Sequence, residues 1–406
     1  MATIAVLGTL DTKGREHAFL ADCIRARGHT PLLVDVGTGA PPQIAPDVSR
    51  EQVWEFAGNG EQPFPNDRGK AVAAMGEAAS RFLRNLSLQN RIQGVVSLGG
   101  GGGTSIGTAA MRALPVGIPK VMVSTLAAGD TSAYLGAKDI VMVPAVLDVA
   151  GLNRISRRVF QQAAGAICGM VEAAEEQVPG APTADKPLIA ASMFGNTTTC
   201  VNTAKSVLES AGYEVLVFHA TGAGGRALEA LVESGAISGV LDVTTTEWAD
   251  EVAGGVLSAG PLRLSAAARS GTPAVVAPGC LDMINFRAPE TVPAAFAGRT
   301  FYHHNPQVTL LRTNAAESAQ IGIRMAERLN ESTGPVTVLL PLKGLSAIGI
   351  EGQPFHDPTA DAALFEALRH HLRPNIPVVE LPTAVNDAAF AQAAAEALLK
   401  MLPARA

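Results

Sequence analysis

A run of five glycines separates an apolar segment from an amphipathic one in the stretch SLGGGGGTSIG. Glycine has no Cβ, so backbone N–H groups there can point at a bound anion, and a following helix adds positive potential. The stretch lacks the Gly-Lys-Ser/Thr of a Walker A loop and matches GxGxxG only through its excess of glycine. It predicts a phosphate cradle, with a flexible strand-to-helix turn as the alternative. The residues concerned are Gly99, Gly100, Gly101, Gly102, Gly103 and Thr104.

Polar side chains follow three other apolar runs of the N-terminal half. Hydroxyl groups, a carboxylate and an ammonium group after the first run suit the phosphate tail of a Mg-nucleotide, and an N-capping loop is the alternative. In VDVGTG, Asp35 is placed like the acidic residue that accepts ribose hydroxyls in nucleotide-binding folds. The predicted nucleotide-binding residues from these loops are Thr9, Asp11, Thr12, Lys13, Asp35, Gly37, Ser124, Thr125 and Asp130.

The C-terminal half carries the more reactive side chains. Several His, Asp and Glu residues stand at loop ends, where they could act as acid and base or bind a divalent metal. The candidate catalytic residues are Glu247, Asp282 and His303. No spacing such as HExxH singles out metal ligands, so the metal ligands stay unknown. Ser346 in PLKGLSAIG does not lie in a GxSxG nucleophile elbow, and we interpret that turn as an anion- or carboxylate-binding loop.

Short Val/Ile/Leu-rich runs alternate with amphipathic stretches along the chain, which implies parallel sheets covered by helices on both faces. The 406 residues exceed one ordinary domain. Prolines and small polar residues mark a linker near 179–187, so we place an N-terminal nucleotide-binding lobe at 1–180 and a C-terminal Rossmann-like lobe at 187–406. The predicted fold class is α/β, with two Rossmann-like lobes whose parallel sheets face each other across a cleft.

The two halves resemble each other in detail. GHTPLLVDVGTGA parallels GYEVLVFHATGAGG, and GVVSLGGGGGT parallels GVLDVTTTEWAD. These pairs indicate an ancestral duplication. The alternative is that all parallel α/β chains repeat such patterns of glycine, strand and turn.

Composition limits the partners and the compartment. The 47% of hydrophobic residues indicates a globular chain, and 31 basic against 37 acidic residues, with no long Lys/Arg run, argues against direct binding of nucleic acid. The four cysteines form no CxxC pair, so we expect neither a zinc ribbon nor disulfides, and a cytoplasmic location. The N-terminal apolar run, about five residues, is too short for a signal peptide or a membrane span. Ala-rich helices allow a homo-oligomer.

Longer motifs spread over the whole chain resemble a known family. They are VLGTLDTKGREHAFL, VDVGTG, GVVSLGGGGGTSIGTAAMRALPVGIPKVMVSTLAAGD, FGNTTTCVN, PGCLDMINF and PLKGLSAIGIEGQPFHDP. Together they resemble the ATP-binding domain family of a plant tobamovirus-resistance protein, an inhibitor of viral RNA replication, and its uncharacterised bacterial relatives. The resemblance implies two Rossmann-like subdomains with ATP bound to the N-terminal one, through the glycine loop, the LDTK loop and the STLAAGD segment. It supplies no reaction, and the plant protein's further barrel domain is not matched, so antiviral activity is not carried over.

Three functions remain open. The expected one is an ATP-dependent enzyme that holds Mg-ATP in the N-terminal lobe and a small polar or carboxylated metabolite in the interlobe cleft. The first alternative is a non-catalytic ATP-binding regulatory or interaction protein. The second is a metal-assisted lyase or hydrolase, in which the glycine loop holds a phosphorylated substrate. The expected cofactors are ATP and Mg²⁺, and the expected partners are a nucleotide and an unknown small molecule.

Overall fold

The structure is a computed structural model that describes residues 1–58, 67–176 and 186–403. The chain forms two compact units, Met1–Pro182 and Thr183–Ala406, here called the N-unit and the C-unit. Each unit is described by itself. The linker predicted near 179–187 lies outside the described residues except for Lys186 and Pro187.

The N-unit is built on a five-stranded parallel sheet with the strand order β2-β1-β3-β4-β5. The direction in which the chain adds strands reverses between β1 and β3, which makes the sheet doubly wound. β1 and β3 are almost completely buried, as parallel strands covered on both faces must be. The strands are β1 (Thr3–Gly8), β2 (Thr30–Asp35), β3 (Gly94–Gly99), β4 (Lys120–Ser124) and β5 (Val141–Pro144).

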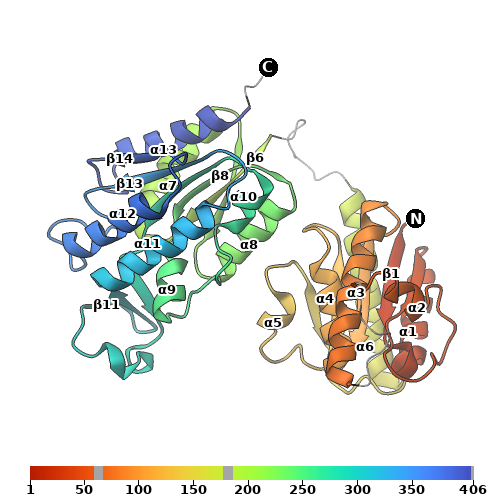
Figure 1. Ribbon diagram of the computed structural model, residues 1–406. Coiled ribbons are helices and arrows are strands. Elements are labelled where there is room, and N and C mark those ends of the chain that lie inside the picture. The colour runs from red at the N-terminus through yellow and green to blue at the C-terminus, as the bar shows by residue number, and fades with distance from the viewer. Residues whose placement is uncertain (59–66, 177–185, 404–406) are drawn as a thin grey trace. The chain divides into compact units, whose positions relative to one another are not determined.

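Helices cover both faces of this sheet (Figure 1). Side chains alternate across a strand, so Ile4 and Val6 of β1 pack in one apolar layer and Ala5 and Leu7 in the other. The first layer includes α1 (Leu10–Arg25) and α6 (Arg154–Glu175), and the second includes α3 (Arg68–Leu88) and α4 (Gly101–Arg112). Two short helices, α2 (Arg50–Trp54) and α5 (Ser132–Leu135), complete the unit.

The C-unit repeats this architecture with one more strand. Its parallel sheet has the order β14-β13-β9-β8-β6-β7. The first five strands of this sheet along the chain, β6, β7, β8, β9 and β13, are arranged in the same order as β1 to β5 of the N-unit. A second, antiparallel sheet has the order β10-β12-β11. The strands are β6 (Leu188–Met193), β7 (Glu214–His219), β8 (Ile237–Thr244), β9 (Ala274–Gly279), β10 (Met283–Phe286), β11 (Phe301–Asn305), β12 (Val308–Arg312), β13 (Val336–Pro341) and β14 (Val378–Leu381).

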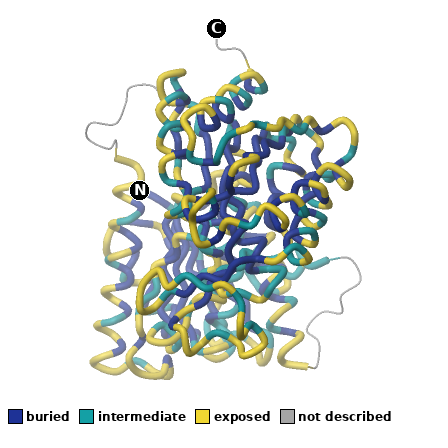
Figure 2. Tube along the Cα trace, turned by 90° about the vertical axis from the view of Figure 1, so that its left-hand side faces the viewer, coloured by how far each residue is buried: buried dark blue, intermediate teal, exposed yellow. Residues whose placement is uncertain are grey.

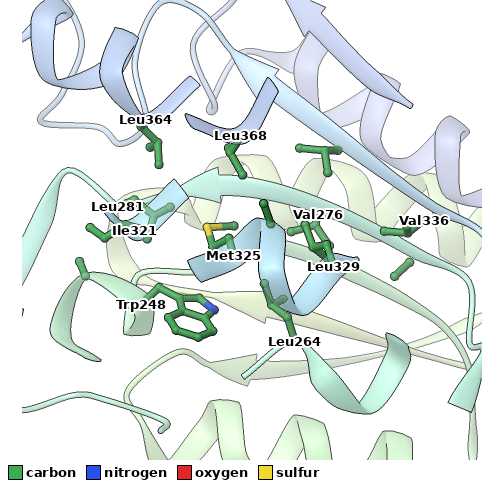
Figure 3. Packing of buried hydrophobic residues seen from close by; sticks show 14 of the residues in the cluster. Trp248, Leu264, Val276, Leu281, Ile321, Met325, Leu329, Val336, Leu364 and Leu368 are labelled. Atoms are coloured by element: carbon green, nitrogen blue, oxygen red, sulfur yellow. The ribbon is translucent and has the colours of Figure 1, made fainter. Parts of the chain in front are cut away.

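Two apolar layers also sandwich the parallel sheet of the C-unit. One contains α7 (Thr198–Ser210) and α13 (Ala388–Met401). The other contains α8 (Ala223–Glu233), α9 (Glu247–Ala253), α10 (Ser265–Ser270), α11 (Ala315–Leu329) and α12 (Pro358–His371). Figure 3 shows this second layer, where the indole of Trp248 lies near Leu264 and below the α11 residues Met325 and Leu329. Short 3-10 turns cover Gly195–Thr197, Pro289–Thr291 and Ala294–Phe296.

These observations confirm the predicted fold class of two parallel-sheet, Rossmann-like units, each with a buried centre (Figure 2). In both units the helix after the first strand shares a face with the last helix, α1 with α6 and α7 with α13. The shared strand order is what an internal duplication predicts. That the two sheets face each other across a cleft stays a prediction.

Two smaller expectations can be compared with the described residues. All four cysteines are free. Within the described ranges, none of the helices combines the length and the apolar composition that a membrane crossing requires.

Candidate functional site

A pocket of about 540 Å³ lies at the carboxyl edge of the N-unit sheet, around the ends of β1 and β3. At this point the helices that follow the two strands cover opposite faces of the sheet, so their loops diverge and leave a crevice. Doubly wound sheets bind ligands at this position. The pocket is lined by Thr9, Asp11, Thr12, Lys13, Thr38, Gly39, Ala40, Arg68, Ala71, Val72, Gly100, Gly101, Gly102, Gly103 and Ile106.

The loop after β1 is shaped by a kink at the start of α1. The N–H groups of Thr12 and Lys13 donate to the Thr9 carbonyl oxygen over 3.2 and 2.9 Å, and Lys13 then departs from helical geometry with φ −129° and ψ 28°. The Lys13 ammonium group, which lines the pocket, also donates to the carbonyl oxygen of Val149. Thr9, Asp11, Thr12 and Lys13 of this loop all line the pocket.

Asp11 joins this loop to the loop after β2. Its Oδ2 accepts the Gly39 N–H over 2.9 Å. A Cβ on Gly37 would lie 2.8 Å from Asp11 Cγ, so the close approach of the two loops requires glycine there. Asp11 lines the pocket, and a carboxylate in that position can serve as an oxygen ligand for Mg²⁺.

Asp35 lies behind the wall of the pocket and does not line it. Its Oδ1 accepts the N–H groups of Leu10, over 3.1 Å, and of Gly37, over 2.9 Å, and its Oδ2 is buried without a hydrogen-bond partner. Burial raises the pKa of this carboxyl group, although the two N–H donors oppose the shift. In this placement Asp35 organises the two loops that form the pocket.

The glycine run serves two different purposes. A Cβ on Gly99 would lie 2.8 Å from the Cα of Gly103, so the turn out of β3 itself requires glycine. A Cβ on Gly101 would have no heavy atom within 4 Å, because it would point into open space. α4 begins at Gly101, and the N–H groups of its first turn have no acceptor within the helix. Bare backbone donors thus form one wall of the pocket.

Four other predicted residues of the N-unit do not line this pocket. The hydroxyls of Thr104 and Ser124 are buried and 2.6 Å apart, which ties α4 to the end of β4. Thr125 lines a neighbouring pocket. Asp130 is exposed and accepts the Ser132 N–H over 2.9 Å. The hydrogen bonds from Ser132 hold the pKa of Asp130 below its usual value.

Arg68, which the sequence motifs did not single out, also lines the pocket. Asp67 caps α3 by accepting the Lys70 N–H over 2.9 Å, so Arg68 stands at the first helical position. In the sequence, an Asp directly before an amphipathic stretch predicts that a helix begins there, and this signal could have placed Arg68 in the first turn. With Lys13, Arg68 and Asp11, the lining residues carry one net positive charge, which favours an anion.

At the corresponding edge of the C-unit, side chains and backbone groups of the chain bond to one another. The hydroxyls of Thr197 and Thr244 meet at 2.8 Å between the loops after β6 and β8. Glu247 is fully buried, and its Oε1 accepts the N–H groups of Gly222, over 2.7 Å, and Gly225, over 3.0 Å, at the start of α8. A carboxylate of the chain thus takes the place at a helix N-terminus that suits an anionic ligand.

Arg263 completes this buried network. Its guanidinium group donates to Glu247 Oε2 over 2.6 Å, to both oxygens of Asp242 over 2.5 and 2.7 Å, and to Glu229 over 3.0 Å. Burial by itself lowers the pKa of Arg263, but the surrounding carboxylates raise it well above its usual value. Both carboxylate oxygens of Glu247 therefore accept hydrogen bonds within the protein, as expected of a residue that stabilises the fold.

Asp282 and His303 lie in other surroundings. Asp282 is fully buried, accepts the Ser346 hydroxyl over 2.5 Å, and has a second oxygen without a partner. Burial, opposed by Arg312, raises the pKa of Asp282 to about 6. His303 is exposed on β11 opposite Thr309. Among the residues that the structure describes, no three His, Cys, Asp or Glu side chains come together as a metal site.

Asp250 connects α9 to β10 through a buried carboxyl group. Its two oxygens accept the backbone N–H and the side-chain amide of Asn285, both over 2.7 Å. Burial raises the pKa of Asp250 to about 7, against these two hydrogen bonds. Because the folded state holds this proton more tightly than the unfolded chain, the contribution of Asp250 to stability is fully present below about pH 4. It is lost as the pH rises through about 7.

We expect Asp250→Asn to remove this part of the pH dependence. The Asn285 Oδ1 is buried without a partner, so a flip of the Asn285 amide lets it accept from the new amide group. Urea unfolding at pH 5, 6 and 7 should give a free energy of unfolding that falls less steeply with pH in the variant than in the wild type. Parallel pH profiles for the two proteins would contradict the assignment.

The N-unit fold and its pocket define a doubly wound α/β protein with a pocket, lined in part by bare backbone, at the point where the strand order reverses. The chain belongs to the uncharacterised protein family UPF0261, because residues 2–176 match its N-terminal domain and residues 186–402 its C-terminal domain.

Three relatives illustrate the range of this family. A UPF0261 protein of Clostridium tetani is 48% identical over 402 residues, with 98% of each chain covered. The UPF0261 protein RA0729 of Rhizobium meliloti is 50% identical over 401 residues, again with 98% of each chain covered. The ToMV resistance protein Tm-1(GCR237) of Solanum lycopersicum is 40% identical over 420 residues, which cover 98% of this chain and 55% of the tomato protein. The resemblance to a plant virus-resistance protein is therefore confirmed.

Proposed function

We propose that the N-unit binds the phosphate groups of a nucleotide, ATP with Mg²⁺, in the pocket between the ends of β1 and β3. The observation that carries this proposal is the wall of bare backbone at Gly100–Gly103, where a Cβ on Gly101 would point into open space. N–H groups at the start of a helix longer than two turns favour a phosphate, and no side chain blocks their approach.

The other walls fit the same ligand. Lys13 and Arg68 supply positive charge for phosphate oxygens, and Asp11 supplies an oxygen ligand for the magnesium ion. Ala40, Ala71 and Val72 give the pocket an apolar side that can hold the base. When bound, Mg-ATP would supply a transferable phosphoryl group. The chain's own residues would hold it in place.

The test is an isothermal titration of the full chain with Mg-ATP, Mg-ADP and adenosine. Because the phosphates carry the interaction, we expect affinity to fall in that order, with adenosine binding at least about tenfold more weakly than ATP, which corresponds to about 1.4 kcal/mol. Equal binding of adenosine and ATP, or no binding of ATP, would overturn the proposal.

We propose further that the bound nucleotide serves an enzyme reaction on a small molecule. A non-catalytic interaction role is the second candidate, and the name of the tomato relative favours it, since that protein is a resistance protein. ADP release in the presence of candidate metabolites separates the two. Stimulated release supports the enzyme, whereas tight binding without any turnover supports the interaction protein.

A further inference from the structure

A second pocket lies next to the first at the same edge of the N-unit sheet. It has a volume of about 400 Å³ and is formed by the ends of β4 and β5, with Ser124, Thr125 and Ala128 on one side. The two pockets meet at the glycine loop. The Thr125 N–H donates to the Gly99 carbonyl oxygen over 3.2 Å, and the Thr125 hydroxyl oxygen lies 3.8 Å from the position of a Cβ on Gly100.

The rim of this pocket is held in a strained conformation. Val146 has φ +65°, and the N–H of Leu147 donates to the Ala145 carbonyl oxygen over 2.7 Å, which closes a tight three-residue turn. A β-branched residue with positive φ is an outlier, and such strain collects at functional sites. The turn leaves Val146 76% and Leu147 42% exposed, so it presents two large apolar side chains at the pocket.

The charge of the pocket comes from Asp148. Of the residues that line it, Asp148 is the one with an ionisable side chain, and it is exposed. The neighbouring Val149 carbonyl oxygen accepts the Lys13 ammonium group of the first pocket. This ammonium group thus has a backbone partner, while the residues that line the second pocket present a carboxylate, hydroxyl groups and apolar walls.

We infer that the second pocket binds a small cationic amphiphile, an amine or amino alcohol with a short apolar body. The ammonium group pairs with Asp148, the hydroxyl meets Thr125, and the apolar body packs on Val146 and Leu147. The like charge of Asp148 repels carboxylates, so this pocket selects against the carboxylated metabolite that the sequence suggests. The ligand class follows from the pocket alone, whereas its role as the second substrate, beside the phosphates, rests on the proposed function.

The experiment is saturation-transfer difference NMR on the full chain, with 2-amino-1-butanol as the probe and 2-hydroxybutanoate as its anionic control. The wild type should bind the probe and not the control. Asp148→Asn keeps the shape and removes the charge, so the Kd of the probe should rise at least fivefold. Val146→Gly relieves the strain of the positive φ, so this variant should fold. It should also bind the probe more weakly, because the apolar contact with the Val146 side chain is lost.

Each outcome decides the inference. Equal probe binding by the wild type and Asp148→Asn, or equal binding of probe and control, would overturn it. A titration of both variants with Mg-ATP keeps the two proposals apart, because Asp148 and Val146 do not line the first pocket. If the probe binds with the expected selectivity while ATP does not bind to any of the three proteins, the ligand class stands and the proposed nucleotide function fails.

Discussion

Gly101→Asp is expected to lower the affinity for Mg-ATP by about 100-fold without disturbing the fold. The new side chain points into open space, so it meets no atom of the protein. An aspartate in the first turn of α4 is also favourable for the helix dipole. Its carboxylate would stand at the proposed phosphate site, and two like charges about 4 Å apart at a protein surface repel by several kcal/mol.

Gly101→Asn is the matched control, because it adds the same volume without the charge. We expect this variant to lose less than about tenfold in affinity, that is, less than about 1.4 kcal/mol. Titration calorimetry measures both variants, and thermal unfolding checks that both are folded. A Gly101→Asp protein that binds ATP like the wild type would show that the phosphates do not lie against this wall.

Arg263→Leu is expected to destabilise the C-unit by about 3–5 kcal/mol, as removal of one partner of a buried ion pair does. The side chain is 1% exposed and is the shared partner of Asp242, Glu229 and Glu247. Without it, three carboxylates remain in the interior without a compensating charge. Urea unfolding at pH 7 measures the loss.

Arg269→Leu is the control for this variant. The Arg269 side chain is 54% exposed and pairs with Glu331, and exposed ion pairs contribute less than about 1 kcal/mol. The two arginines lie close in sequence and differ mainly in burial. If both variants lost the same small amount, the carboxylates around Arg263 would have to be protonated or hydrated, and the network would not hold the unit together.

The sequence predicted the fold well because the signals for a parallel sheet are local. Continuous apolar runs such as IAVLG and GVVSLG became central strands, and the glycines after the second run became the start of a helix. The LDTK loop also reached the pocket as expected. These features depend on the order of residues along one segment, which the sequence displays.

The sequence could not show how a residue is placed where that placement depends on a distant partner. Glu247 was predicted to be catalytic because it follows a strand end. Its ion-pair partner Arg263 comes from a separate loop, and no sequence pattern predicts that contact. Asp35 follows a strand at a position that is typical of a ribose contact. In the structure its carboxylate is buried and accepts the N–H groups of Leu10 and Gly37. Arg68 entered the pocket from a region that the motifs did not cover.

The Glu247 carboxylate has a consequence for how the two halves respond to a ligand. In the C-unit, this carboxylate is part of the chain and occupies the position at the N-terminus of α8, so these contacts form without any added molecule. In the N-unit the corresponding edge has an open pocket, and a ligand that binds there stabilises the folded state as its concentration rises. The proposed ligand would therefore tie the stability of the N-unit to the supply of a metabolite, whereas the contacts of Glu247 in the C-unit need no added molecule.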